Sequence, residues 1–324
     1  MKKVKIEEAV GEVLCHDLTG ITDSGFKGVR FSRGHVIAPE DLDVLRDMGK
    51  NHIYIWEPGV EEVHEEDAAR AVVEVIGSDT LIYEGPKEGK FTIKAACDGL
   101  FVVDAKAVQA INSVGDYTLV TVADKKAVKA GETVAGLRII PLVTLKANVA
   151  QAVELARASS PVLHVKPFMA KVTRLLITGE EIYSGRIQDR FEGVLRPKLR
   201  NYGAEVDKVV YCPDDRAFIE AQIHRAVEDG VALILLTGGM SVDPDDVTMD
   251  AIEGVSTVLI TKGVPMQPGN MLTLARYDHT ILVGVPGASM HAPFTSLDVV
   301  LPRIFADDPI TSEEIATWGV GGLL

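Results

Sequence analysis

Four aspartates lie just after a glycine pair that ends an apolar run. The run, Val231–Leu236, reads VALILL and is followed by Thr237-Gly238-Gly239. The aspartates are Asp243, Asp245, Asp246 and Asp250. Paired glycines let backbone N–H groups approach a ligand closely, which favours an anion such as phosphate. Because carboxylates and a phosphate share a site best through a cation, this stretch predicts bound Mg²⁺.

A second interpretation of the aspartates needs no ligand. One of them would cap the helix that we expect to begin near Thr248, and the others would be solvated loop charges. For any single aspartate this is the commoner situation. For the whole cluster behind a Thr-Gly-Gly turn we expect a metal site, with Asp246 and Asp243 as the ligands.

The surrounding sequence predicts the sheet that would position this site. The apolar run is typical of a strand buried on both faces, as in parallel sheets covered by helices. Strands are expected at KVTRLLITG, EVDKVVYC, VALILLTGG, TVLITKG and TILVGVPG, and helices at 185–203, 214–230, 250–254 and 288–305. In the first helix Ile187, Phe191, Val194 and Leu195 would share the inward face. This alternation predicts an α/β fold with a doubly wound, mostly parallel sheet over residues 168–324.

Four loops follow strands of this predicted sheet. They are residues 178–181 (TGEE), 212–215 (CPDD), 237–239 (TGG) and 285–289 (VPGAS). Ligands of doubly wound sheets bind outside the carboxyl ends of the strands. We therefore expect the four loops to meet on one rim and to form a single site.

The first half of the chain predicts two smaller α+β regions, residues 1–58 and 59–167. In the first, a strand ends near Phe31, a helix opened by Pro39 closes at Gly49, and a strand runs from His52 to Trp56. An acidic connector over residues 57–66 separates the two regions. In the second, helices are expected at 67–76, 104–113 and 145–159, strands at 80–85 and 90–95, and a hairpin over 117–142 with its turn at 129–132.

Composition excludes several classes of protein. A formal net charge of −14 argues against a nucleic-acid or anionic-membrane surface. The apolar runs are far shorter than the ~18 residues of a membrane span, and MKKVKIEEAV carries acids where a secretory signal is apolar. Cys15, Cys97 and Cys212 are typical of reduced thiols. We expect a cytoplasmic protein with neither nucleic acid nor membrane as a partner.

Five segments of the second half carry a resemblance to a known family. They are TGEEIYSGRI, PDD, LLTGGMSVDPDDVT, KGVPMQPGN and VGVPGASMHAPF, within residues 171–309. They resemble the molybdopterin-binding domain of molybdenum cofactor biosynthesis proteins, in the order found in molybdopterin molybdenumtransferases of the MoeA and gephyrin type. VRFSRGHVIAPEDLDVLRDMG is similar to the amino-terminal region of the same family. The sequence departs from the transferases at Asn270, where they carry lysine after a Pro-Gly pair.

The resemblance implies a role for each residue of the rim. The terminal phosphate of molybdopterin, or of its adenylylated form, would be cradled by Thr237, Gly238, Gly239 and Ser241. Asp246 matches the acid that the family uses beside metal and molybdate, Asp214 or Asp215 matches a second such acid, and Glu181 matches the acid of the first loop. The resemblance implies catalytic roles for Asp246, Asp214 and Glu181. The other cofactor-binding residues implied are Thr178, Gly179, Pro286, Gly287 and Ser289.

The function that the resemblance implies is insertion of molybdate, assisted by Mg²⁺, into a bound adenylylated dithiolene with release of AMP. Two alternatives remain open: a molybdopterin adenylyltransferase that uses ATP, and a non-catalytic carrier or sensor of molybdopterin. The loss of the lysine at Asn270 favours the carrier or sensor. The family usually works as a homodimer, so we expect a homodimer here.

Overall fold

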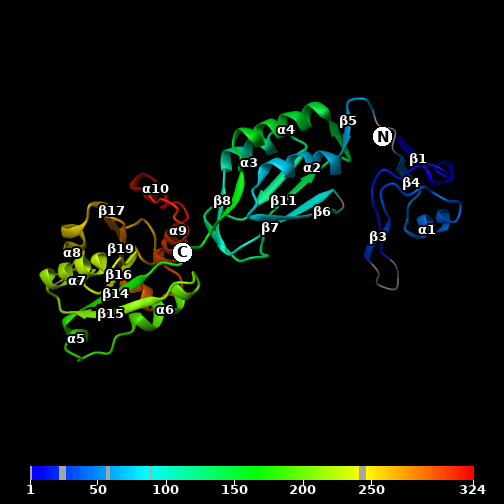
Figure 1. Cartoon of the computed structure of the whole chain (residues 1–324). Coiled ribbons are helices and arrows are strands. Elements are labelled where there is room, and N and C mark those ends of the chain that lie inside the picture. The colour runs from blue at the N-terminus through cyan, green and yellow to red at the C-terminus, as the bar shows by residue number, and fades with distance from the viewer. Residues whose placement is uncertain (1, 22–26, 56–58, 88, 241–245) are drawn as a thin grey trace. The chain divides into compact units, whose positions relative to one another are not determined.

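The protein folds into two compact units, Met1–Val165 and Lys166–Leu324, in the computed structural model (Figure 1). The structure describes residues 2–21, 27–55, 59–87, 89–240 and 246–324. Within these ranges, no helix has the length and apolar character needed to cross a bilayer. The boundary expected near residue 58 falls at residues 56–58, outside the described ranges, so the division into three regions stays a prediction.

The first unit begins with short antiparallel strand pairs. β1 (Lys2–Lys5) pairs with β4 (His52–Ile55), and β2 (Leu18–Ile21) pairs with β3 (Lys27–Phe31). The 3₁₀ helix η1 (Ile6–Glu8) and helix α1 (Asp41–Asp47) complete this part. Gly49 follows α1 with a φ of +72°, which agrees with the expected glycine stop. These elements share a core of their own, which includes Val4, Ile6, Leu14, Ile37, Leu45, Ile53 and Ile55.

The rest of the first unit is built on an antiparallel sheet. Its strand order is β6 (Leu81–Lys87), β7 (Lys90–Ala95), β11 (Thr133–Ile139) and β9 (Tyr117–Thr121). Helix α2 (Glu65–Ile76) packs on β6, β7 and β11, while α3 (Ala105–Asn112) contacts β9 and α4 (Lys146–Ala158) packs on α2. Two smaller sheets join β10 (Lys126–Val128), β8 (Gly99–Val103) and β13 (Leu163–Pro167), and β12 (Val143–Leu145) with β5 (Glu62–His64). The expected hairpin is confirmed only in part. Its two arms, β9 and β11, pair as antiparallel strands, but the segment between them forms a further strand, β10, which pairs with β8.

A six-stranded, mostly parallel sheet forms the centre of the second unit and confirms the predicted fold class. The strand order is β15 (Val206–Cys212), β14 (Thr173–Thr178), β16 (Leu233–Thr237), β19 (Thr280–Val285), β18 (Thr273–Tyr277) and β17 (Val258–Lys262). The first four strands are parallel to one another, and β18 and β17 are antiparallel to their neighbours. Such a sheet brings the carboxyl ends of four strands to one edge.

Both faces of this sheet are covered, and the side chains of β14 show how. Leu175 and Ile177 point to a core shared with α6 (Phe191–Arg200) and α9 (Ser296–Phe305). Leu176, between them, points to a core shared with α7 (Arg216–Glu228) and α8 (Thr248–Val255). Successive residues of a strand face opposite sides, so a run that is apolar throughout must be buried on both. The remaining short helices are α5 (Glu180–Tyr183), η2 (Gly287–Met290) and α10 (Ser312–Thr317).

Two expected helices of this unit were wrong in part, and one strand was missed. The helix expected from residue 185 begins at Phe191, because the Asp189 carboxylate accepts the N–H groups of Phe191 and Glu192, so exposed Ile187 precedes it. The last helix divides into η2 and α9, because Thr295 and Asp298 form a reciprocal cap that starts a new helix. β18 was not predicted, since its hairpin turn to β19 is Asp278-His279, which lacks the Asn-Gly or Asp-Gly signature.

Candidate functional site

A cleft of about 720 Å³ opens at the carboxyl ends of the parallel strands. Small-molecule sites commonly measure roughly 300–1,000 Å³, so the cleft is large enough for a two- or three-ring ligand. Its position follows from the strand register. Ile177 of β14 lies opposite Thr237 of β16, which lies opposite Val285 of β19, so the three strands end at one level. The segments that follow these three strands all contribute to the lining.

The structure brings part of the predicted rim into this cleft. The predicted residues that line it are Thr178, Glu181, Gly238, Gly239, Asp246 and Gly287. Thr178 is the last residue of β14, and the others come from the segments that follow β14, β16 and β19, as expected for strands that end together. Their assigned roles in phosphate binding and catalysis stay predictions.

Gly238 and Gly239 are required by the fold at this point. Their φ values are +83° and +52°, in the left-handed region that favours glycine. A Cβ on Gly238 would lie 2.2 Å from the carbonyl oxygen of Thr178, and one on Gly239 would lie 2.6 Å from the Thr248 hydroxyl. The two glycines thus let the end of β16 pass against β14 and the start of α8.

Two threonine hydroxyls at the strand ends have different surroundings. Thr178 Oγ1 donates to the Thr237 carbonyl oxygen at 3.0 Å and lies 2.9 Å from Thr248 Oγ1. Thr237 Oγ1 is fully buried and has no hydrogen-bond partner among the described residues. Thr178 lines the cleft, whereas Thr237 does not. The Thr178 hydroxyl is therefore engaged in joining β14, β16 and α8.

Other predicted site residues lie outside the lining. The Asp214 carboxylate accepts the N–H of Glu180 at 2.8 Å, so it fixes the start of α5. Ser289 is buried, with its hydroxyl 3.1 Å from Thr295 Oγ1. Buried Gly179 and Pro286 support the adjacent loops. Ser241 and Asp243 lie outside the described residues, as does Asp245.

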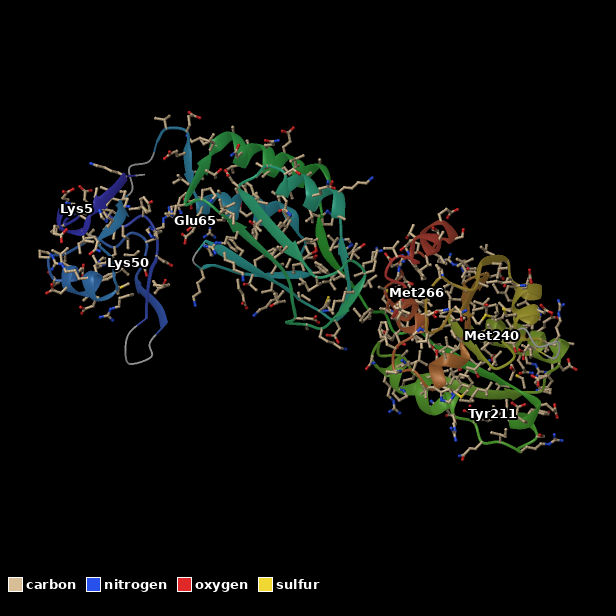
Figure 2. The ribbon with its side chains drawn as sticks, turned by 180° about the vertical axis from the view of Figure 1, so that it is seen from behind. Lys5, Lys50, Glu65, Tyr211, Met240 and Met266 are labelled. Carbon is tan, nitrogen blue, oxygen red and sulfur yellow. The ribbon has the colours of Figure 1, made fainter. Side chains whose placement is uncertain are left out.

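Several residues that line the cleft were not assigned to the site from the sequence, although Ile187 and Phe191 were expected on the inward face of a helix. The apolar ones are Ile182, Ile187, Phe191, Met240, Met271 and Met290, and the polar ones are Gln188, Arg190 and His291. Met240 directly follows the glycine pair and is labelled in Figure 2. Arg190 and His291 belong to a connector and to the end of a 3₁₀ helix, where no motif marks them. Only the three-dimensional fold brings them beside the strand ends.

The acids that line the cleft are Glu181 and Asp246. No group of three or more His, Cys, Asp and Glu side chains suited to a metal ion occurs among the described residues. Mg²⁺ commonly takes one or two protein carboxylates together with water and substrate phosphates. The two carboxylates are compatible with this donor set.

Cys212 ends β15 at the same edge of the sheet, and burial raises the pKa of its thiol to about 12. The side chain is fully buried. A thiol with so high a pKa stays protonated near neutral pH, and the thiolate is the reactive form. Cys212 therefore contributes to packing at this edge of the sheet and does not act as a nucleophile there.

Comparison with protein families divides the chain in two. Residues 174–306 match the family described as "Probable molybdopterin binding domain". Residues 3–57 match a domain of unknown function, DUF8806. The first match covers the four parallel strands, apart from Thr173 of β14, and every described residue that lines the cleft. The second unit thus contains a domain of the molybdopterin-binding type, and the finer likeness to molybdenumtransferases stays a prediction.

Individual relatives are similar to shorter parts of the chain. A CinA-like protein of Mycobacterium tuberculosis (strain H37Ra) is 37% identical over 78 residues, which are 24% of this chain and 18% of that protein. The CinA-like protein of Mycolicibacterium gilvum is 35% identical over the same length and the same shares. The aligned segment thus spans less than a fifth of the length of these relatives.

Solved structures with a similar fold cover about two fifths of the chain. The molybdopterin biosynthesis enzyme MoaB of Thermus thermophilus aligns with 41% of this chain and 91% of its own, at 23% identity and a TM-score of 0.37. The tungsten cofactor synthesizing protein MoaB of Pyrococcus furiosus aligns with 42% and 93%, at 15% identity and a TM-score of 0.36.

Proposed function

We propose that the second unit binds molybdopterin, a phosphorylated pterin dithiolene, in the cleft at the strand ends. One observation carries this proposal: the cleft lies within the residues that match the molybdopterin-binding family and is large enough for the pterin ring system. Phe191, Met271 and Met290 offer an apolar wall for the rings. Ligand sites typically combine such a wall with a few polar groups that fix orientation.

Insertion of molybdate into the bound dithiolene is a second, finer proposal. Asp246 favours it, because this carboxylate lines the cleft beside Gly239 and four aspartates occur within residues 243–250. When bound there by Asp246 and the ligand phosphates, Mg²⁺ would supply neutralisation of the charge on the adenylylated ligand. Glu181, from the loop after β14, would orient the ligand from another side. The products would be the molybdenum-loaded dithiolene and AMP.

Activity assays separate the three functions that the molybdopterin-binding type allows. Adenylylated molybdopterin, Mg²⁺ and molybdate are mixed with the full chain, and AMP is measured. A parallel reaction contains molybdopterin and ATP, and pyrophosphate is measured. AMP release supports molybdate insertion, pyrophosphate formation supports adenylyl transfer, and tight molybdopterin binding without either product supports a carrier or sensor.

A matched pair of variants tests the role of Asp246. Asp246→Asn should abolish Mg²⁺-dependent AMP release, because the amide no longer offers a charged oxygen ligand. Asp250→Asn is the control, since Asp250 is an exposed residue of α8 outside the lining. Equal activity in both variants would remove Asp246 from the proposal. Failure of the wild-type chain to bind molybdopterin would remove the proposed function itself.

A further inference from the structure

Two basic side chains line the cleft, and neither has a side-chain partner among the described residues. They are Arg190 and His291. Within the described ranges, no ion pair or hydrogen bond involves the Arg190 guanidinium or the His291 ring. Both side chains are exposed. They are available to a ligand.

Two cations of the neighbouring helix α6 are paired, in contrast to Arg190. Arg196 pairs with Glu192 at 2.6 Å on α6, and Lys198 pairs with Asp298 and also donates to the Pro293 carbonyl oxygen. In a chain with a net charge of −14, acceptors for an arginine are abundant. The cleft even contains the carboxylates of Glu181 and Asp246, yet Arg190 is bound to neither.

The two basic residues come from elements that touch each other. Arg190 is the residue that immediately precedes α6, and His291 is the residue that immediately follows η2. Helices α6 and η2 are in contact, and Lys198 of α6 further ties this helix to the segment after His291. The two side chains thus belong to one wall of the cleft, whereas Gly238, Gly239 and Asp246 belong to the loop after β16.

No other part of the rim supplies positive charge. The four loops at residues 178–181, 212–215, 237–239 and 285–289 contain neither lysine nor arginine. The segment 264–272, which carries the cleft residue Met271, contains none either, and Asn270 stands where the related transferases have lysine. Among the described lining residues, an anion in the cleft would find the guanidinium of an arginine only at Arg190, with the His291 ring as a further hydrogen-bond donor.

We infer that Arg190 and His291 bind the phosphate of the pterin and make the cleft selective for phosphorylated over unphosphorylated pterins. The inference rests on the proposed function and deepens it. The arginine guanidinium presents a planar fork of donors that fits two phosphate oxygens, and a histidine N–H adds a third donor. The phosphate is then in contact with the α6–η2 wall of the cleft.

Binding of two pterins that differ only in a phosphate tests the inference. One probe is a pterin with a phosphomonoester side chain, and the other is the same pterin with a free hydroxyl. Pterin fluorescence gives the Kd of each with the full chain. Wild-type protein should bind the phosphorylated probe more tightly. Arg190→Gln and His291→Gln should each raise the Kd for the phosphorylated probe by roughly 10- to 100-fold, which is the value of a charge-assisted hydrogen bond. Neither variant should change the Kd for the unphosphorylated probe.

Two control variants make the same substitutions outside the cleft. Arg186→Gln changes an exposed arginine of the same connector, and His279→Gln changes an exposed histidine in the β18–β19 turn. Both should bind the two probes as the wild type does. The Arg190 side chain makes no capping hydrogen bond to α6, so Arg190→Gln should fold normally, which its circular dichroism would verify.

The outcomes distinguish this inference from the proposed function. If the wild type prefers the phosphorylated probe and both cleft variants keep that preference, the inference is overturned and the proposed function stands. If the cleft variants lose affinity for both probes equally, Arg190 and His291 shape the cleft without recognising phosphate, and the inference is also overturned. If the wild type binds neither probe, the proposed function itself fails.

Discussion

The two ends of the parallel sheet use charged and polar side chains in opposite ways. At the amino-terminal end, Arg174 of β14 pairs with Asp207 at 2.6 Å and with Asp229 at 2.7 Å, and only 7% of its side chain is exposed. At the carboxyl end of the same strand, the chain opens into the cleft, where Arg190 and His291 pair with nothing in the described residues. A paired arginine stabilises a fold, whereas an unpaired one in a cleft is available to a ligand. Four changes test this contrast.

The largest effect is expected at Gly238. Gly238→Ala should lower the free energy of unfolding of the second unit by about 3 kcal/mol or more, because the new Cβ meets the Thr178 carbonyl oxygen and φ is positive. Urea unfolding is followed by Trp318 fluorescence in a Trp56→Phe background. Gly287→Ala is the control, since its Cβ has no neighbour within 4 Å, and it should stay within about 0.5 kcal/mol of wild type. A stable Gly238→Ala protein would show that the strand ends are less tightly joined than described.

A substitution at the amino-terminal end of the sheet should lower the stability of the fold without weakening ligand binding. Arg174→Met removes both ion pairs and leaves two partly exposed aspartates, which should cost about 2 kcal/mol. The Kd for the phosphorylated pterin should not change. The control Arg216→Met removes an exposed pair with Glu220 and should have no measurable effect on unfolding. A large change in ligand affinity in Arg174→Met would break the contrast between the two ends.

Alkaline pH should lower the free energy of unfolding of the second unit through Tyr202. Burial, with a contribution from the charge of Asp298, raises the pKa of Tyr202 to about 12, and its ring stacks on Phe305 at 4.8 Å. The unfolded chain ionises this tyrosine near pH 10, so its contribution to stability is complete below pH 10 and is lost as pH rises toward 12. The loss should be on the order of 1 kcal/mol. It is measured by urea unfolding from pH 9 to 11.5, and Tyr202→Phe should flatten the profile; an unchanged profile would contradict it.

The smallest effect is expected at Asp214, at the same edge as the cleft. Its carboxylate accepts the Glu180 N–H, and Asn keeps an oxygen for that bond, so Asp214→Asn should cost less than about 1 kcal/mol. Ligand affinity should stay within about twofold of wild type. A tenfold or larger loss of affinity would return Asp214 to the binding site that the sequence predicted for it.

The sequence predicted the parts of this fold that depend on local apolar patterns. The run before Gly238 is apolar at every position, and only a strand covered on both faces satisfies that pattern. The hairpin of β18 and β19 escaped prediction because Asp278-His279 is a weak turn signal, and its formation depends on β19 lying beside β16. Ile187 was assigned to a helix because its spacing fits, but the Asp189 cap starts the helix later.

The candidate site was predictable where glycines and acids follow strands, as at Gly238, Gly239, Glu181 and Asp246. Arg190 and His291 were not, because nothing local places a connector residue beside a strand end; the packing of α6 against η2 does so. Asp214 was assigned to the site because it follows a strand, and it does lie at this edge of the sheet. Its carboxylate instead accepts the Glu180 N–H, a bond that depends on the pairing of β15 with β14 and that the local sequence does not reveal. Motifs thus located the edge of the sheet, and tertiary contacts decided which side chains line the cleft.

A crystal structure of the full chain grown with molybdopterin tests the central claim most directly. The account predicts pterin density among Phe191, Met271 and Gly239, with the phosphate in contact with Arg190 and His291. Density for the pterin at any other place on the protein, with this cleft filled only by solvent, would contradict it.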